Sequence, residues 1–186
     1  MSISQEDRTE LLRLAREGVR AAVAGGPRPK PARTDGLLGE QRGCFVTLTN
    51  RGRLRGCIGT FHPSKPLARQ ILEMAEAAAH DPRFVYNAIT PAEVDHLTVG
   101  VSVLTPLEPI DDPLRIELGV HGIYVARGGS AGCFLPEVAT ETGWSKEQFL
   151  SHCCGDKAGM NPDDWRTGRA KVFVFTTEKF EESGKC

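Results

Sequence analysis

The sequence predicts an α+β fold in which a mostly antiparallel sheet packs with helices. Strand-like and helix-like segments follow one another without regular βαβ repetition, which favours antiparallel pairing. Two pairs of strand candidates are also joined by short turns that contain glycine. The chain has 186 residues, of which 40% are hydrophobic and 25% charged, as in a globular protein with a sizeable core. A chain of this length suits one domain over residues 1–186, or one domain with an added lobe.

The expected elements of the N-terminal half are an amphipathic helix, a loop rich in glycine and proline, two strands and two helices. Ser4 caps the first helix, Pro82 ends the helix at 66–81, and Thr90 with Glu93 forms a capping box. The turn Asn50-Arg51-Gly52 joins the two strands. In order, these elements occupy residues 4–23, 25–36, 44–49, 54–61, 66–81 and 90–97.

The C-terminal half is expected to hold a half-buried strand, a hairpin, two short helices and a final strand. Alternation of apolar and polar residues predicts the first strand, and Ser145 with Gln148 predicts a capping box for the second helix. A glycine-rich turn closes the hairpin. These elements occupy residues 97–103, 121–136, 136–141, 145 onward and 171–177.

The formal net charge is −1, with 23 basic and 24 acidic residues, which gives no reason to expect nucleic acid or an anionic membrane as a partner. Arg51, Arg53 and Arg55 alternate and could still form a local basic face. The sequence contains no apolar run of about 18 residues and no secretory signal pattern at its polar N-terminus. We therefore expect a cytoplasmic protein.

The stretch LRGCIGTF, residues 54–61, is the strongest candidate for a functional site. Glycines inside a strand often mark the close approach of a ligand or another backbone. In a regular strand Arg55 and Cys57 share a face, and a guanidinium near a thiol favours the thiolate. Gly56 and Gly59 would leave room for a small molecule. Alternatively, Cys57 is a packing residue on a glycine-rich edge strand, with Arg55 at the surface.

The cysteines do not indicate a disulfide framework or a metal site. A chain of this length without a secretory signal does not need disulfides, and no C-x-x-C pair occurs. His152 precedes two adjacent cysteines, which rarely bind one metal together. We interpret most of the cysteines as small buried hydrophobic residues. The six are Cys44, Cys57, Cys133, Cys153, Cys154 and Cys186.

Three further segments carry polar residues with possible chemistry. His121 could move protons near neutral pH, although it is also a plausible turn residue. Asp81 and Arg83 lie at a predicted helix exit, where they could bind a ligand or simply cap the helix. Lys157 is flanked by small residues and could bind an anion, or lie solvated in a loop.

Taken together, the motifs LRGCIGTF, AAAHDPRF, VSVLTPLEPI, GVHGIYV, CFLPEVA and GWSKEQFLSHCCGDKAG closely resemble the AMMECR family. The ordered resemblance runs from about Leu11 to Glu181. It implies an α+β protein of two unequal lobes with a cleft near LRGCIG, and no firmly assigned reaction. It also implies membership of a multi-protein enzymatic system with MEMO-like and radical SAM proteins. Further motif residues carried over by the resemblance are Phe84, Gly122, Leu135, Pro136, Ala158 and Gly159.

Two functions compete, and the sequence leaves open whether the protein is an enzyme. As an enzyme component, it would use Cys57 as a nucleophile and His121 as a proton carrier. As a binding module or adaptor, it would hold a small ligand or a partner segment in the cleft. The candidate ligand-binding residues are Arg55, Gly56, Ile58, Gly59, Asp81, Arg83 and Lys157. We expect no cofactor, and we give nucleic-acid binding through the arginines a low rank.

Overall fold

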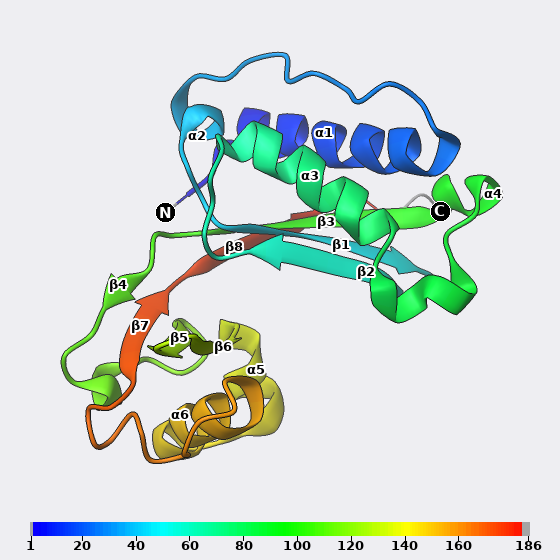
Figure 1. The fold of residues 1–186 in the computed structure, drawn as a ribbon. Coiled ribbons are helices and arrows are strands. Elements are labelled where there is room, and N and C mark those ends of the chain that lie inside the picture. The colour runs from blue at the N-terminus through cyan, green and yellow to red at the C-terminus, as the bar shows by residue number, and fades with distance from the viewer. Residues whose placement is uncertain (1, 184–186) are drawn as a thin grey trace. The chain divides into compact units, whose positions relative to one another are not determined.

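The computed structural model describes residues 2–183 of the chain (Figure 1). Cys186 lies outside the described residues. The described chain divides into two compact units, the first running up to Leu104 and resuming at Glu178, the second spanning Thr105–Thr177. Each unit has its own four-stranded sheet, its own helices and its own core. The predicted α+β class with antiparallel pairing is confirmed.

The first unit contains a sheet with the strand order β2-β1-β3-β8 (Figure 1). Strand β1 pairs antiparallel with both β2 and β3, and β2 forms one edge of the sheet. The strands are β1 (Cys44–Asn50), β2 (Arg53–Thr60), β3 (Leu97–Leu104) and β8 (Thr177–Glu181).

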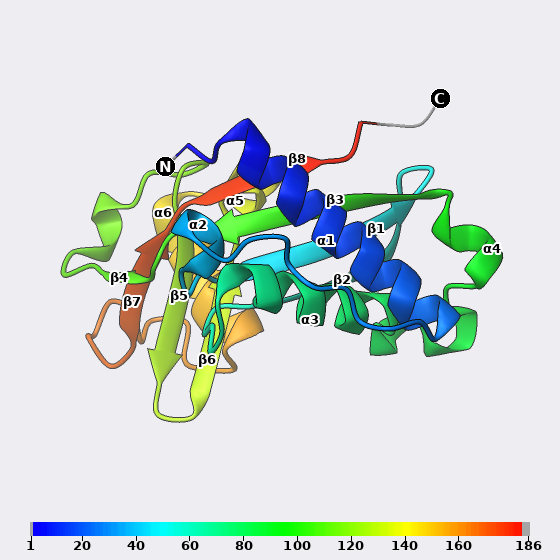
Figure 2. The ribbon, with the colours of Figure 1, turned by 90° about the horizontal axis from the view of Figure 1, so that it is seen from above.

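Two long helices, α1 (Gln5–Ala24) and α3 (Leu67–Ala79), lie side by side over one face of this sheet (Figures 1 and 2). Helix α1 begins after Ser4, whose hydroxyl accepts a hydrogen bond from the Asp7 amide at 3.1 Å, as predicted. Gly18 lets the two helices approach closely, because a β-carbon there would lie 3.1 Å from that of Ala75. Three short helices complete the unit: α2 (Gly36–Gly39), η1 (Pro82–Asn87) and α4 (Pro91–Val94).

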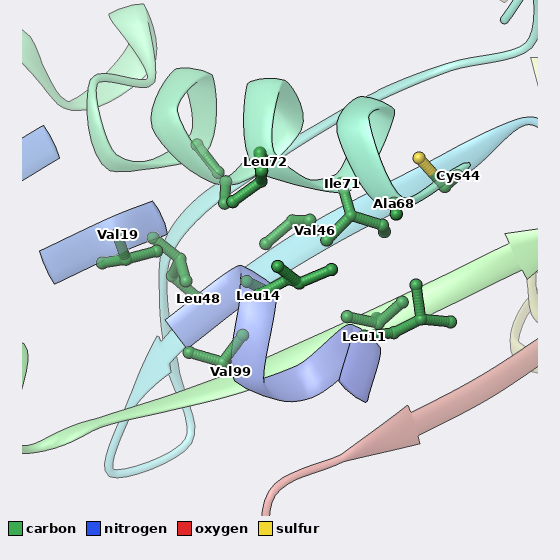
Figure 3. Close-up of a cluster of buried hydrophobic side chains, with 14 of the residues drawn as sticks. Leu11, Leu14, Val19, Cys44, Val46, Leu48, Ala68, Ile71, Leu72 and Val99 are labelled. Atoms are coloured by element: carbon green, nitrogen blue, oxygen red, sulfur yellow. The ribbon is translucent and has the colours of Figure 1, made fainter. Parts of the chain in front are cut away.

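The core of the first unit lies between these helices and the sheet (Figure 3). Alternation along β1 directs Cys44, Val46 and Leu48 to the helices, where they are fully buried. Burial raises the pKa of the Cys44 thiol to about 12, so this cysteine is an inert packing residue, as expected. Leu14 of α1 and Ile71 of α3 meet these strand residues from the opposite side.

The second unit contains a sheet with the order β4-β7-β5-β6 and a core of its own. The predicted capping box of α6 is present, since the Gln148 amide donates to the Ser145 hydroxyl at 3.3 Å and the Ser145 amide to the Gln148 side chain at 2.9 Å. Cys153 and Cys154 are buried, and burial raises the pKa of both thiols. The elements are β4 (Glu108–Pro109), η2 (Pro113–Arg115), β5 (Gly122–Arg127), β6 (Ser130–Phe134), α5 (Pro136–Thr142), α6 (Lys146–His152), η3 (Cys153–Lys157) and β7 (Lys171–Phe175).

Three expectations differ from the structure. The final strand expected at 171–177 is two strands, β7 and β8, because the chain leaves the second sheet at Thr176 and enters the first. Strand β3 is buried at every residue but Thr98, rather than half-buried, because residues of the flanking strands crowd its small residues: a β-carbon on Gly100 would lie 3.7 Å from that of Glu181 and 3.9 Å from that of Thr47. The loop expected at 25–36 ends one residue early, where α2 begins.

Within the part of the chain that the structure describes, no helix combines the length and the apolar composition needed to cross a bilayer.

Candidate functional site

Cys57 lies on edge strand β2, and its backbone is paired by two side chains instead of another strand. Opposite Thr47 of β1, its amide and carbonyl face outward from the sheet. The amide donates to the Asp81 carboxylate at 3.0 Å, and the carbonyl accepts from Arg83 Nη2 at 3.0 Å. Residues at the exit of α3 therefore close the edge of the sheet at the centre of LRGCIG.

The Asp81–Arg83 pair is itself extensively bonded. Arg83 donates from Nη2 to Asp81 Oδ2 at 2.6 Å, and its amide and Nε both donate to Oδ1 at 3.0 Å. The Asp81 side chain is fully buried, whereas that of Arg83 is 56% exposed. The Arg83 guanidinium, helped by the amides of Cys57 and Arg83, holds the pKa of Asp81 well below its usual range. Asp81 is therefore an ionised structural acceptor at neutral pH.

Gly56 and Gly59 serve the close approach of other parts of the protein. A β-carbon on Gly56 would overlap the Ala78 carbonyl oxygen near the end of α3. A β-carbon on Gly59 would overlap the ring of Phe45 on the neighbouring strand. Ile58, between them, packs against the first core. The three residues thus have packing partners within the first unit, and their assignment to a ligand stays a prediction.

Arg55 occupies a β-bulge, which changes its expected direction. Leu48 pairs with Gly56 and Thr49 pairs with Leu54, so Arg55 is the extra residue of β2. The alternation that would place Arg55 beside the Cys57 thiol therefore does not apply. The Arg55 side chain is 10% exposed and binds Glu93 through two hydrogen bonds, at 2.6 Å from Nε and 2.9 Å from Nη2.

Glu93 bonds residues far from it in the sequence as well as the start of its own helix. The Thr90 side chain makes no capping bond, so the predicted capping box is incomplete. The Glu93 carboxylate accepts from Arg55 and, at 3.0 Å, from Asn50 Nδ2. The Arg55 guanidinium, with smaller contributions from Asn50 and the Thr90 backbone amide, lowers the pKa of Glu93. The Asn87 carbonyl accepts a further bond from Arg55 at 2.9 Å. A buried arginine needs an acidic partner, and this requirement is the one feature of the sequence that could have pointed to Glu93.

The Cys57 thiol is half-buried and contacts the Thr47 hydroxyl at 3.2 Å. A nucleophilic cysteine is activated by an adjacent base or by nearby positive charge, and threonine is not a base. Among residues 2–183, no three His, Cys, Asp or Glu side chains are grouped so that they could hold a metal ion.

The other two predicted site residues belong to the second unit. His121 precedes β5, and its Nδ1 accepts from the Glu117 amide at 3.0 Å. Lys157 ends η3 with its ammonium 5.5 Å from the centre of the Phe134 ring, a cation–π contact. Gly132 lies directly beneath this turn, because a β-carbon there would be 2.7 Å from the β-carbon of Lys157. The first unit brings Arg55, Cys57, Asp81 and Arg83 together.

We predict that Asp81→Asn destabilises the edge of the first sheet and makes the unfolding free energy less dependent on acid pH. A lowered folded-state pKa stabilises the fold above the unfolded carboxyl pKa of about 4, and this stabilisation is lost as the pH falls further. The variant should lose about 2 kcal/mol at pH 7 and show a shallower acid decline. Urea unfolding against pH and hydrogen exchange of the Cys57 amide measure both effects. Exposed Asp111→Asn is the control; an Asp81→Asn profile that matches the wild type contradicts the assignment.

We also predict that Gly56→Ala destabilises the first unit by about 1–3 kcal/mol, since the added methyl group meets backbone rather than a flexible side chain. The control is Gly129→Ala, where no atom lies within 4 Å of the added carbon. Equal unfolding free energies for the two variants, measured by urea titration, would show that α3 does not need this glycine.

Comparisons with known proteins show the family of the chain. The AMMECR1 family profile matches residues 12–180. A protein of Methanothermobacter thermautotrophicus is 40% identical, with 98% of this chain and 97% of that protein covered. A protein of Thermococcus gammatolerans is 44% identical over 92% of this chain and 88% of its own length.

A solved structure gives the same result. The crystal structure of the uncharacterized protein PH0010 from Pyrococcus horikoshii has a TM-score of 0.82 and 39% identity, covering 94% of this chain and 90% of that one. The motif resemblance, the family match and the shared fold lead to one conclusion: this chain belongs to the AMMECR1 family.

Proposed function

We propose that this chain is a ligand-binding component of a multi-protein enzymatic system, and that it binds its ligand beside the LRGCIG motif. The observation that carries the proposal is a pocket of about 450 Å³ in the first unit. Arg55 and Asp81 lie in its wall, next to the side chains of η1 and the end of α3. The lining residues are Val23, Arg55, Ala79, His80, Asp81, Pro82, Phe84, Val85, Ala88 and Ile89.

The chemistry of this pocket favours a small, largely apolar molecule that carries one acidic or carbonyl group. Small-molecule sites are commonly about 300–1,000 Å³, mostly apolar, with a few polar groups that fix orientation. Phe84 supplies an aromatic wall, with the guanidinium carbons of Arg55 and Arg83 5.9 and 5.7 Å from its ring centre. His80 would bind the acceptor atoms of the ligand, beside the Arg55 guanidinium that Glu93 holds in the pocket wall.

A binding role has more support than a nucleophilic role for Cys57. The thiol contacts Thr47, and the Asp81 carboxylate near its backbone is committed to Arg83 and two amides. The polar groups of the motif therefore hold the strand and the pocket wall in place. This arrangement suits preorganised binding.

Exposed apolar side chains beside the pocket support a protein partner. Val85 is 64% exposed and Tyr86 is fully exposed, both on η1, and Leu54 on β2 is 41% exposed. Solvent-facing aromatic and branched residues of this kind are typical of interaction surfaces. In line with the family resemblance, we propose MEMO-like and radical SAM proteins as the partners and the cytoplasm as the place where they meet.

We predict that 8-anilino-1-naphthalenesulfonate, an apolar aromatic anion, binds this pocket and becomes fluorescent. Ala88→Trp, at the rim, should fill the pocket and raise the dissociation constant about tenfold or more. Ala92→Trp on α4 is the matched control and should bind as the wild type does. Thermal melts establish that all three proteins are folded. Equal binding by all three, or none by the wild type, counts against the pocket.

The partner surface makes a separate prediction. Val85→Ser should weaken any complex with a MEMO-like or radical SAM protein of the same organism about tenfold, because it removes an apolar anchor. Val120→Ser, which is 44% exposed in the second unit, is the control. Size-exclusion chromatography with light scattering measures complex formation. If the wild type forms no complex with either protein, the proposed partners are wrong.

A further inference from the structure

A second pocket, of about 580 Å³, lies at the tip of the β1–β2 hairpin and has a different character. It is lined by amides, guanidinium groups and an imidazole, and none of its lining residues in the described chain is acidic. The lining residues are Asn50, Arg51, Arg53, Arg55, Asn87 and His96. It shares only Arg55 with the apolar pocket described above.

The charges around this pocket are unbalanced in favour of the cations. Glu93, behind the wall, is matched by Arg55. Asp95, next to His96 in sequence, is bound by Arg20 at 2.8 Å. Arg51 and Arg53 have no carboxylate partner anywhere in residues 2–183. The guanidinium groups of Arg51 and Arg53 therefore remain to attract an anion, whereas that of Arg55 is already neutralised by Glu93.

The hairpin turn places Arg51 at an energetic cost. Arg51 has φ +48° and Gly52 φ +76°, the left-handed pair that a two-residue hairpin of type I′ requires. Asparagine or glycine adopts this conformation readily, whereas Arg51 is the one residue other than glycine with positive φ in the described chain. Strained backbone tends to occur at functional positions, so this outlier indicates that the guanidinium is needed there.

We propose that this hairpin pocket binds the phosphate groups of a small phosphorylated molecule. Guanidinium groups bind phosphate oxygens through two parallel hydrogen bonds, and Arg51 in the turn and Arg53 at the start of β2 present two such groups. The amide side chain of Asn87 and the ring of His96 add polar contacts at the wall. The volume suits a phosphate or diphosphate with a modest organic part.

The test is calorimetric titration of the full chain with inorganic pyrophosphate at constant low ionic strength. The wild type should bind, and Arg53→Gln should raise the dissociation constant about tenfold or more. Arg51→Asn should do the same while melting at or above the wild-type temperature, because asparagine suits the turn. Arg69→Gln removes the same charge from an exposed position on α3 outside the pocket and should bind as the wild type does.

Three results would overturn the proposal. The first is the absence of binding by the wild type. The second is equal weakening by Arg69→Gln, which would show that only net charge matters. The third comes from fluorescence anisotropy with a labelled single-stranded oligonucleotide: tighter binding than pyrophosphate that depends on Arg53 would assign the surface to nucleic acid. Ala88 does not line this pocket, and the apolar pocket is tested with a different ligand and a different variant, so failure here leaves the apolar pocket to be judged on its own test.

Discussion

The carboxylate of Asp81 binds the edge of the first sheet, and this contact explains several residues of LRGCIG. An outward-facing amide on an edge strand must find a partner, and Asp81 supplies it to Cys57. The end of α3 must then lie directly against β2, which requires Gly56. The buried carboxylate needs a cation, and Arg83 supplies one while it also pairs with the Cys57 carbonyl. The edge is thereby closed at Cys57 to pairing with another chain.

The bulge at Arg55 is the second constraint, because it decides what the motif's guanidinium can do. It takes Arg55 out of the regular alternation and into a two-bond contact with Glu93. Glu93 also accepts from Asn50, and Arg55 also donates to the Asn87 carbonyl. One ion pair thus joins the hairpin, η1 and α4. Arg55 lines both pockets, and η1 contributes residues to each of them, so the shapes of both pockets depend on this buried pair.

The elements with strong local signals could be predicted from the sequence, and the contacts between distant residues could not. Ser4 and Ser145 marked the starts of two helices because capping is a local interaction. The role of Glu93 was missed because its partner lies 38 residues away. A bulge also leaves no clear trace in the pattern, so the alternation rule placed Arg55 on the wrong face. The division of 171–177 into β7 and β8 likewise depends on which sheet each half joins.

The polar groups of LRGCIG are mostly paired with other groups of the protein. The residues that recognise a ligand should therefore be neighbouring residues whose polar groups lack such partners. A ligand that took Arg55 from Glu93 would leave a half-buried carboxylate without its cation, which costs more than the new contact would return. Arg51, Arg53 and the apolar surface of η1 carry no such penalty. The motif therefore positions these neighbouring groups. In this way a glycine-rich strand contributes to ligand recognition although its own side chains do not contact the ligand.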